Sequence, residues 1–424
     1  MCTAESHQGG NSMPDSAQLD FKLDVKALGH RLTGHLDALR EVDSLFWSEI
    51  NQAWMVTGHK EVLDGYFGKL PLSSVRLPFL AVAHLSEEEQ AQIPETIEAP
   101  RHWLLNMDGP EHHRIRRLIQ KAFGRKVVEV IRPDVQRYIQ EALDKVAAVE
   151  GTVDFVEDVA RIIPARMILK VLGFDDTLIG RMQHWSIYMN TTGNLNVPLS
   201  ELLEVDKVIA ELNSLFRPLF EEKRRNPGDD FISALVTAVD EGDTLTEEEM
   251  LGICQITLIA GHDTTVNTMA LGAAELARHP EAVAELRAAE EINLDKIMEI
   301  QRKAQMSTFM SRIVAEDFTW NGRELKKGQF VLLFQSAANR DPAVFENPDG
   351  FDFSRSQQAN LTFAPGLHHC IGHLLAKMVL SEFFPAFIKR FDFELEDDTL
   401  DFAPTMAFRG LEALPMTLTE RKSA

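Results

Sequence analysis

The sequence predicts a mainly helical protein with a small β-rich region toward its C-terminal end. Between about residue 25 and residue 315, apolar residues recur at helical spacing, with one short strand-like interruption at 54–58. One helical stretch, roughly 246–278, is apolar over nearly its whole length. After about residue 315 the pattern changes to short apolar runs separated by turn residues, which is typical of hairpins and short strands. Together these observations favour helices packed around a buried centre, with strands at one side.

Composition excludes several classes of function. The 424 residues hold 65 Asp and Glu against 43 Lys and Arg, a formal net charge of −22, which disfavours nucleic acid as a partner because phosphate binding needs clustered cations. Three scattered cysteines favour a reducing compartment over a disulfide framework. The sequence has neither a run of 18 apolar residues nor a basic start followed by an apolar stretch. We therefore expect a cytoplasmic protein without a membrane span, and a monomer.

Two segments lack a regular pattern. Residues 1–22 are expected to form a mobile N-terminal tail, because their Ser, Gly, Asn and Gln offer little that a core could bury. The stretch from Leu72 to Leu105 carries several prolines and apolar residues without steady periodicity. A loop this long in a compact protein is usually a lid or a binding loop. It is a candidate substrate region, although a surface excursion without function fits the pattern nearly as well.

The longest helix is expected over roughly 246–278. Thr246 and Glu249 form a capping-box pattern at its start, and Arg278-His279-Pro280 supplies basic residues and a stop. About 32 residues at the helical rise span about 48 Å, so this helix must cross the middle of the protein. The later elements are expected to be a hairpin at Asp317–Arg323, a strand at Phe330–Phe334, coil over 339–353 and a helix at His373–Phe384.

The sharpest local feature is the tight loop Phe363–Gly372, here called the cysteine loop, which opens directly into that last helix. A cysteine at a helix N-terminus has its thiolate stabilised by the macrodipole and by free N–H groups. Cys370 is therefore expected to be a metal ligand or a nucleophile. Glycines on both sides clear space for a bulky group, which disfavours a cysteine that is merely a small apolar residue.

Two other chemistries compete for this loop. His368, His369, Cys370 and His373 form a dense cluster, but a structural zinc site draws spaced pairs of ligands from two segments. Four neighbours in one tight turn cannot all point inward. A nucleophilic cysteine with His368 or His369 as its base is possible in principle. Nothing elsewhere in the sequence supplies the partner that would orient such a base.

The segment Ala260–Thr265 places a glycine, an aspartate and two threonines in the middle of the long helix. These residues cost helix propensity, and a threonine hydroxyl bonded to a carbonyl one turn earlier tends to bend or open a helix. Two interpretations stay open. Gly261 could be a packing notch, with Asp263 paired to a buried cation. Alternatively, Asp263 and Thr264 could face a cavity at a widened turn and relay protons to a bound oxygen species.

Two further helices carry charged pairs. In the helix that begins near residue 110, His112 and Arg116 lie four residues apart at the edge of the apolar face. Such side chains can hold carboxylates or phosphates. Glu299 and Arg302, three apart on a later helix, are weak evidence alone because such pairs are common on surfaces.

In their order and spacing, these segments resemble the bacterial soluble cytochrome P450 family over residues 45–420. By resemblance, Cys370 is the thiolate ligand of a haem b iron, and a thiolate favours O–O cleavage. The resemblance also makes Asp263 and Thr264 the oxygen-activation pair, and Glu299 and Arg302 a buried structural ion pair. It implies four residues that hold the haem propionates: His112, Arg116, Arg312 and His368.

The resemblance implies the cytochrome P450 fold, with residues 23–424 forming a single haem-binding monooxygenase domain. One atom of O₂ would enter a C–H bond or an alkene of an apolar small molecule, and the other would leave as water. Electrons are expected from NAD(P)H through a ferredoxin and its reductase, because no reductase segment follows residue 420. The alternatives are non-oxygenating or peroxide-driven haem-thiolate chemistry, and a haem-binding sensor without turnover.

Three positions depart from the family pattern. Ala364 replaces a glycine or small polar residue in the cysteine loop. Gly350 stands where an arginine often completes the Glu/Arg network, a role that Arg355 could take. The stretch 303–311 lacks the prolines often found there.

Two surfaces complete the expected site. The substrate pocket is expected to draw on Ile259, Ala260, Thr308, Phe309, Met406 and Phe408, beside the loop over residues 72–105. A docking patch for an acidic electron carrier is expected at five basic residues: Arg114, Arg117, Lys121, Arg125 and Lys126.

Overall fold

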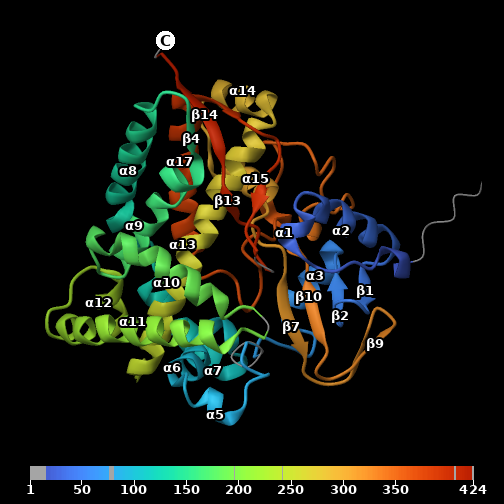
Figure 1. Ribbon diagram of the computed structural model, residues 1–424, viewed down its shortest axis with the longest axis vertical. Coiled ribbons are helices and arrows are strands. Elements are labelled where there is room, and N and C mark those ends of the chain that lie inside the picture. The colour runs from blue at the N-terminus through green and yellow to red at the C-terminus, as the bar shows by residue number, and fades with distance from the viewer. Residues whose placement is uncertain (1–15, 76–80, 195, 241, 405–406, 423–424) are drawn as a thin grey trace, which may run out of the picture.

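Helices make up most of the chain, and the strands gather at one side of it. The computed structural model describes residues 16–75, 81–194, 196–240, 242–404 and 407–422. In Figure 1 the helices from α8 to α13, together with α17, fill one side, whereas β1, β2, β7 and β10 lie on the other side with α1 to α3. The predicted fold class, mainly helical with a small β-rich region, is confirmed.

The bounds of the elements are as follows. The α-helices are α1 (Val25–Leu28), α2 (Arg31–Val42), α3 (His59–Tyr66), α5 (Glu87–Gln90), α6 (Pro94–Glu98), α7 (Gly109–Ala122), α8 (Arg125–Ala147), α9 (Ile162–Val171), α10 (Ile179–Thr191), α11 (Leu199–Arg225), α12 (Phe231–Val236), α13 (Glu247–Ala277), α14 (Pro280–Ala288), α15 (Leu294–Ala304), α16 (Gln335–Ala338) and α17 (His373–Arg390). Shorter helical turns are η1 (Ser16–Leu19), η2 (Ala99–His102), η3 (Leu104–Asn106), η4 (Val156–Ala160), η5 (Asp176–Leu178) and η6 (Gln357–Ala359). The strands are β1 (Leu45–Ser48), β2 (Ala53–Val56), β3 (Leu72–Ser73), β4 (Thr152–Asp154), β5 (Val239–Asp240), β6 (Asp243–Thr244), β7 (Met310–Val314), β8 (Phe318–Trp320), β9 (Arg323–Leu325), β10 (Phe330–Leu333), β11 (Phe391–Leu395), β12 (Asp401–Phe402), β13 (Leu411–Ala413) and β14 (Pro415–Glu420).

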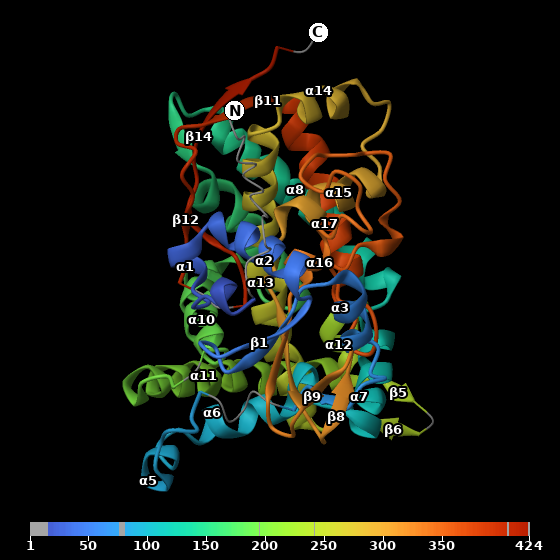
Figure 2. The ribbon, with the colours of Figure 1, turned by 90° about the vertical axis from the view of Figure 1, so that its right-hand side faces the viewer.

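The long helix α13 runs through the middle of the helical part (Figures 1 and 2). Its capping box forms as the sequence predicts: Glu249 N donates to Thr246 Oγ1 at 3.2 Å, and Thr246 N donates to Glu249 Oε2 at 2.8 Å. Its 31 residues form one continuous α-helix, so the widened turn expected at Ala260–Thr265 is not present. The threonine hydroxyls bond back to carbonyls without opening the helix.

Glycines let neighbouring elements approach α13 closely. A Cβ added to Gly252 would lie 2.5 Å from the carbonyl oxygen of His102 in η2, and one added to Gly272 would lie 2.5 Å from the Phe384 ring of α17. A larger residue at either position would push the His102 backbone or the Phe384 ring away from α13. The glycines therefore fix where α13 lies relative to both neighbours.

The largest sheet has the strand order β1-β2-β10-β7-β3. β2 is antiparallel to β1 and parallel to β10, with Trp54 opposite Val331. All four residues of β2 are buried, which is typical of a strand covered on both faces. One apolar cluster, which includes Val62 and Tyr66, packs α3 on this sheet, and another, which includes Leu36 and Leu39, packs α2. The strand expected at 54–58 is confirmed, as are those at 317–323 and 330–334.

The structure corrects three boundaries. Within the expected tail 1–22, residues 1–15 lie outside the described part, but Leu19 and Phe21 pack on an apolar cluster and Asp20 accepts a hydrogen bond from Ser48 at 2.6 Å. The tail is therefore shorter than expected at its C-terminal end. The described part of the 72–105 loop contains β3 and four short helical segments. The helix after the cysteine loop continues past Phe384 to Arg390.

Within the described residues, no helix is long and apolar enough to cross a membrane.

The contact between Gly252 and η2 gives a stability prediction. Gly252→Ala forces a methyl group against the His102 backbone and is expected to lower the free energy of unfolding by about 1–3 kcal/mol, the usual cost of overpacking. Gly34→Ala is the matched control: Gly34 is exposed inside α2, its added Cβ meets nothing within 4 Å, and the change is expected to stabilise by about 1 kcal/mol. Urea unfolding of both variants measures the two changes, and a Gly252→Ala protein as stable as the parent would contradict the close contact.

Candidate active site

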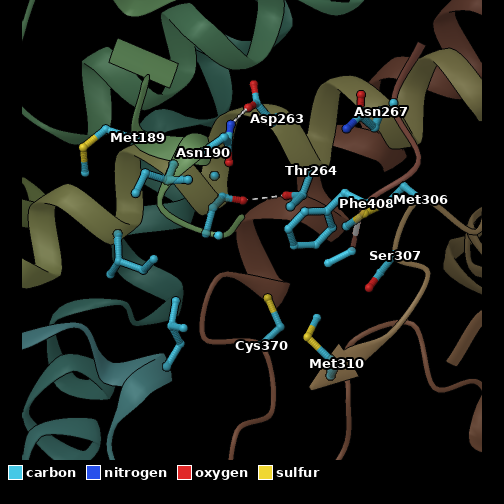
Figure 3. A pocket seen from close by; sticks show the side chains of 18 of the residues that line it. Met189, Asn190, Asp263, Thr264, Asn267, Met306, Ser307, Met310, Cys370 and Phe408 are labelled. Atoms are coloured by element: carbon cyan, nitrogen blue, oxygen red, sulfur yellow. Dashed lines mark hydrogen bonds between the residues drawn. The ribbon is translucent and has the colours of Figure 1, made fainter. Parts of the chain in front are cut away.

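A cavity of about 1400 Å³ lies between α13 and the cysteine loop. Its walls come from η2, η3, α9, α10, α13, β7 and the segment 403–412, and most of the side chains that line it are apolar. Figure 3 shows Cys370 on one side of this space and Thr264 on the other. The sequence-predicted sulfur and hydroxyl, more than a hundred residues apart in the chain, therefore reach the same cavity.

Local backbone bonds shape the cysteine loop. Cys370 N donates to the Phe363 carbonyl oxygen at 3.0 Å and closes the loop. Gly366 has a φ of +104°, and a Cβ there would collide with the Tyr66 carbonyl oxygen, so only glycine fits. Ala364, one of the departures from the family pattern, has a φ of +47°, a conformation that favours glycine and is strained for alanine. The backbone of the loop is thus strained at Ala364, two residues before Gly366.

The Cys370 thiol is not ionised by the loop alone. Burial raises the pKa of the thiol, and the backbone of Gly372 and the charge of Arg116 only partly oppose this. Helix α17 begins three residues after Cys370, at His373. A metal that binds this sulfur has to displace its proton.

The zinc and nucleophile alternatives gain no support from the geometry. In the part of the chain that the structure describes, no group of three His, Cys, Asp or Glu side chains could hold a metal ion. His373 Nδ1 lies 2.9 Å from the carbonyl oxygen of Cys370, and the His369 and His373 rings pack on each other at 4.6 Å. These rings are engaged with the backbone and with one another.

Two arginines at the cavity wall have no carboxylate partner. Arg116 donates to the His369 carbonyl oxygen at 2.5 Å, and the buried Arg312 donates to the Ser311 carbonyl oxygen at 2.8 Å. Among the described residues, no carboxylate forms an ion pair with either guanidinium. Burial lowers the pKa of both groups, so an anionic ligand would be strongly favoured beside them.

His112 and His368, which also belong to the predicted propionate-binding set, pack against each other with tilted rings whose centroids are 4.3 Å apart. His368 Nε2 lies 3.6 Å from Asp108 Oδ1, whereas His112 Nε2 is buried with no hydrogen-bond partner among the described residues. Burial, together with the charges of His368 and Arg116, lowers the pKa of His112 to about 4. The four residues thus fit a ligand that brings carboxylates, as the two propionates of haem would.

Asp263 points from α13 toward α10 and not into the middle of the cavity. His262 Nδ1 lies 2.6 Å from Asp263 Oδ1, Ser186 Oγ donates to Asp263 Oδ2 at 2.7 Å, and Asn190 donates to the same oxygen (Figure 3). Burial alone would raise the pKa of Asp263, but the hydrogen bonds from His262, Ser186 and Asn190 lower it on balance. The carboxylate is therefore ionised and fixed.

Both interpretations of the Ala260–Thr265 segment hold in part. Thr264 Oγ1 donates to the Ala260 carbonyl oxygen at 2.5 Å and faces the cavity. Gly261 is also a packing notch, because a Cβ there would collide with Ile168 of α9. The buried partner of Asp263 is the His262 imidazole.

Comparison with known proteins decides between the remaining interpretations. The family model described as Cytochrome P450 matches residues 89–294 and 295–414.

The chain belongs to the cytochrome P450 family.

Its relatives are similar along nearly their whole length. It is 29% identical over 404 residues to Cytochrome P450 CYP107DY1 of Priestia megaterium, covering 93% of this chain and 96% of the relative. It is 30% identical over 374 residues to Mycinamicin IV hydroxylase/epoxidase of Micromonospora griseorubida, covering 86% and 89%. The solved structure of CYP109E1 from Bacillus megaterium in complex with testosterone superposes with a TM-score of 0.77 at 28% identity, covering 91% and 98%. The chain is a cytochrome P450 monooxygenase, and the family implies a haem iron.

The Glu299–Arg302 pair of this P450 is fully buried. Arg302 Nε and Nη2 each donate to a Glu299 oxygen at 2.8 Å. Arg302 also donates to the carbonyl oxygens of Asn339, Pro348 and Gly350, at 2.9, 3.1 and 3.2 Å. Burial alone would raise the pKa of Glu299, but the bonds from Arg302 lower it overall, so the carboxylate is ionised. This pair fastens the coil that leads into the cysteine loop.

Arg355 takes the place of the arginine missing at Gly350. Its Nε lies 3.5 Å from Glu299 Oε1, and its guanidinium lies 5.7 Å from the centre of the Phe345 ring, which Arg302 approaches at 5.3 Å. A second guanidinium therefore lies beside Glu299, supplied from five residues further along the chain, although Arg355 Nε makes no hydrogen bond with a described residue.

Of the residues expected in the substrate pocket, four line the cavity and one does not. Ile259, Ala260, Phe309 and Phe408 line the cavity, and Met406 lies outside the described residues. Thr308 does not line it: its N–H donates to Ala407 O at 2.8 Å, its carbonyl accepts from Ser336 Oγ at 2.9 Å, and its side chain is completely buried.

The sequence analysis missed several residues that line the same space. They are Met189, Asn190, Asn267 and Ser307. Most of them carry no charge and belong to ordinary helical or extended patterns, so no residue type singled them out. Met189 and Asn190 of α10 reach the cavity only because α10 crosses α13.

The network gives a prediction that separates its two arginines. Glu299→Gln leaves Arg302 as an uncompensated buried cation and is expected to lower the free energy of unfolding by about 3–5 kcal/mol. Arg355→Gln leaves Glu299 with both bonds from Arg302 and is expected to cost only about 1 kcal/mol. Urea unfolding and the haem content of the purified proteins measure both effects. Equal losses from the two variants would contradict the assignment of Arg302 as the main partner.

Proposed function

We propose that this P450 inserts one atom of O₂ into an apolar small molecule, by hydroxylation or epoxidation. The observation that carries the proposal is that the Cys370 sulfur and the Thr264 hydroxyl face one another across one large, mostly apolar cavity (Figure 3). The haem would lie between them. Residues 23–424 act as one domain in this proposal, because both ends of the chain contribute to the cavity.

The residues at the cavity wall fit haem b. Cys370 would hold the iron through its sulfur, and the propionates would be bound by Arg116, Arg312, His112 and His368. Bound haem with a thiolate ligand supplies the electron density that favours O–O cleavage. The chain's own contribution is to supply the sulfur, to neutralise the propionates and to exclude water from the space above.

The polar residues of α13 would manage protons. Thr264 holds its hydroxyl proton on the Ala260 carbonyl oxygen, so Thr264 Oγ1 keeps its lone pairs toward the cavity and can accept or pass on a proton there. The Asp263 carboxylate is held on α10 by hydrogen bonds from Ser186 and Asn190, so it must first take up a proton on the α10 side before it can pass one on toward Thr264. A fixed carboxylate next in sequence to a hydroxyl at the cavity wall suits the movement of protons into the cavity.

The substrate class is an apolar molecule of considerable size. The cavity exceeds the usual range of small-molecule sites, about 300–1,000 Å³, so it has room for haem and a large substrate together. Met189, Met306 and Met310 line it with flexible thioethers that adapt to irregular shapes. A relative named for mycinamicin and a structural neighbour solved with testosterone support a polyketide- or steroid-sized substrate.

Electrons in this proposal come from NAD(P)H through a separate ferredoxin and ferredoxin reductase. The protein would work as a cytoplasmic monomer.

Product analysis with labelled oxygen tests the proposal. A compound library is first screened for ligands that displace the haem-bound water, read as a shift of the main visible band. The best ligand is then incubated with the holoprotein, a ferredoxin, its reductase and NADPH under ¹⁸O₂. We expect a product that carries one ¹⁸O atom and that depends on NADPH. Unlabelled product, or product formed only with peroxide, would favour the non-oxygenating or peroxide-driven alternatives, and ligand binding without product would favour a sensor.

Thr264→Val is the matched variant for that experiment. It removes the hydroxyl at nearly constant volume and is expected to lower the product formed per NADPH consumed by about tenfold or more, the usual scale of a lost proton donor. The band shift on ligand binding should persist, because the apolar walls remain.

A further inference from the structure

One face of α7 carries three cations that the proposed chemistry does not use. Arg114, Arg117 and Lys121 lie at positions i, i+3 and i+7 and form what we call the α7 stripe. Arg116, beside them, donates to the His369 carbonyl oxygen at 2.5 Å, so α7 packs against the cysteine loop. The stripe therefore begins within one helical turn of the residue that contacts this loop.

An acidic hairpin, defined here as β5 and β6, lies beside α7 (Figure 2) and pairs with the stripe. Asp240 of the hairpin accepts from Arg117 Nε at 2.7 Å and from Lys121 Nζ at 2.8 Å. Asp243 lies 3.3 Å from Arg114 Nη1. The three predicted docking residues are therefore already paired with carboxylates of the same chain, which the sequence did not indicate.

The neighbouring residues extend the same pattern. Glu249, in the first turn of α13, also pairs with Arg114. Lys126, at the start of α8, lies 2.6 Å from Asp229. The α7 stripe thus binds a row of three carboxylates, from Asp240, Asp243 and Glu249, and the segment that supplies them is more than a hundred residues away in the chain.

The ion pairs that hold the hairpin on the α7 stripe are weak enough for another acidic group to replace them. The side chains of Arg117 and Lys121 are 57% and 51% exposed, and exposed ion pairs contribute only about 0–1 kcal/mol each. The two strands have two residues each and pair only with one another. Another acidic surface that offers carboxylates to the same cations can therefore replace the hairpin at modest cost in free energy.

We propose that the acidic hairpin is a built-in competitor for the electron carrier: an acidic ferredoxin binds the α7 stripe by replacing Asp240 and Asp243 with its own carboxylates. The inference rests on the proposed supply of electrons from a ferredoxin. The observation behind it is charge complementarity already present in the molecule, because the stripe holds carboxylates in a row beside the cysteine loop. The hairpin lowers the positive potential that would steer the carrier, so the parent protein is reduced more slowly than its stripe allows.

Asp240→Asn tests the inference, with Asp392→Asn as the matched control. Both changes remove one negative charge and two ion pairs, but Asp392 pairs with Arg287 and Arg421 on β11, at the opposite end of the molecule from the hairpin (Figure 2). The probe is an acidic plant-type [2Fe–2S] ferredoxin, reduced and mixed with the oxidised holoprotein under carbon monoxide. Stopped-flow absorbance gives the second-order rate constant of reduction at each salt concentration.

We expect Asp240→Asn to raise this rate constant about three- to tenfold at low ionic strength, and the gain to vanish near 1 M salt, where the Debye length falls to about 3 Å. Asp392→Asn should stay within about twofold of the parent protein. An unchanged rate for Asp240→Asn, or an equal gain from Asp392→Asn, would overturn the inference while leaving the proposed electron supply intact. If the ferredoxin reduces no variant although dithionite does, the proposed carrier and this inference both fail.

Discussion

The buried ion pair between Glu299 and Arg302 is the interaction on which the position of the active site depends. Arg302 is completely buried, and its remaining donors reach three backbone carbonyls of the coil between α16 and η6. Asn339 Oδ1, in that coil, accepts from Leu361 N at 2.8 Å, two residues before the cysteine loop begins. Among the described residues, this coil forms no regular backbone hydrogen bonds with a neighbouring strand. The buried Arg302 guanidinium, with its five N–H donors, fixes the position of the coil instead. Arg302 of α15 therefore fixes the segment that leads to the cysteine loop, and this holds Cys370 in place.

The wall of the cavity opposite Cys370 is formed by α13, whose position depends on close packing more than on charge. Glycines at 252, 261 and 272 let η2, α9 and α17 approach α13 closely, and together they set both its position and its rotation. That rotation turns Thr264 toward the cavity and Asp263 toward α10. The side chains of Asp263 and Thr264 are about 100° apart around the helix axis. Thr264 can therefore face the cavity while Asp263 is hydrogen-bonded to α10.

Sequence reasoning succeeded where the chemistry depends on a local pattern. The cysteine loop, the capping box of α13 and the spacing of Glu299 and Arg302 are all short motifs: the cap and the ion pair form as predicted, and the cysteine loop lines the cavity. It failed where an answer depended on a distant partner. Thr308 does not line the cavity, and its backbone bonds to Ala407 and Ser336; the cations of α7 meet carboxylates more than a hundred residues away. Nothing in the local sequence records such partners.

The central claim is that Cys370 supplies the sulfur that binds the haem iron, and the spectrum of the ferrous carbonyl complex tests it most directly. The chain offers a matched control, because Cys254 is a second buried thiol, on α13. The parent protein and Cys254→Ala, each reduced with dithionite under carbon monoxide, should both give the spectrum typical of a thiolate-ligated complex. Cys370→Ala should lose that spectrum, whether or not haem is retained. A thiolate-type carbonyl spectrum in Cys370→Ala would contradict the account.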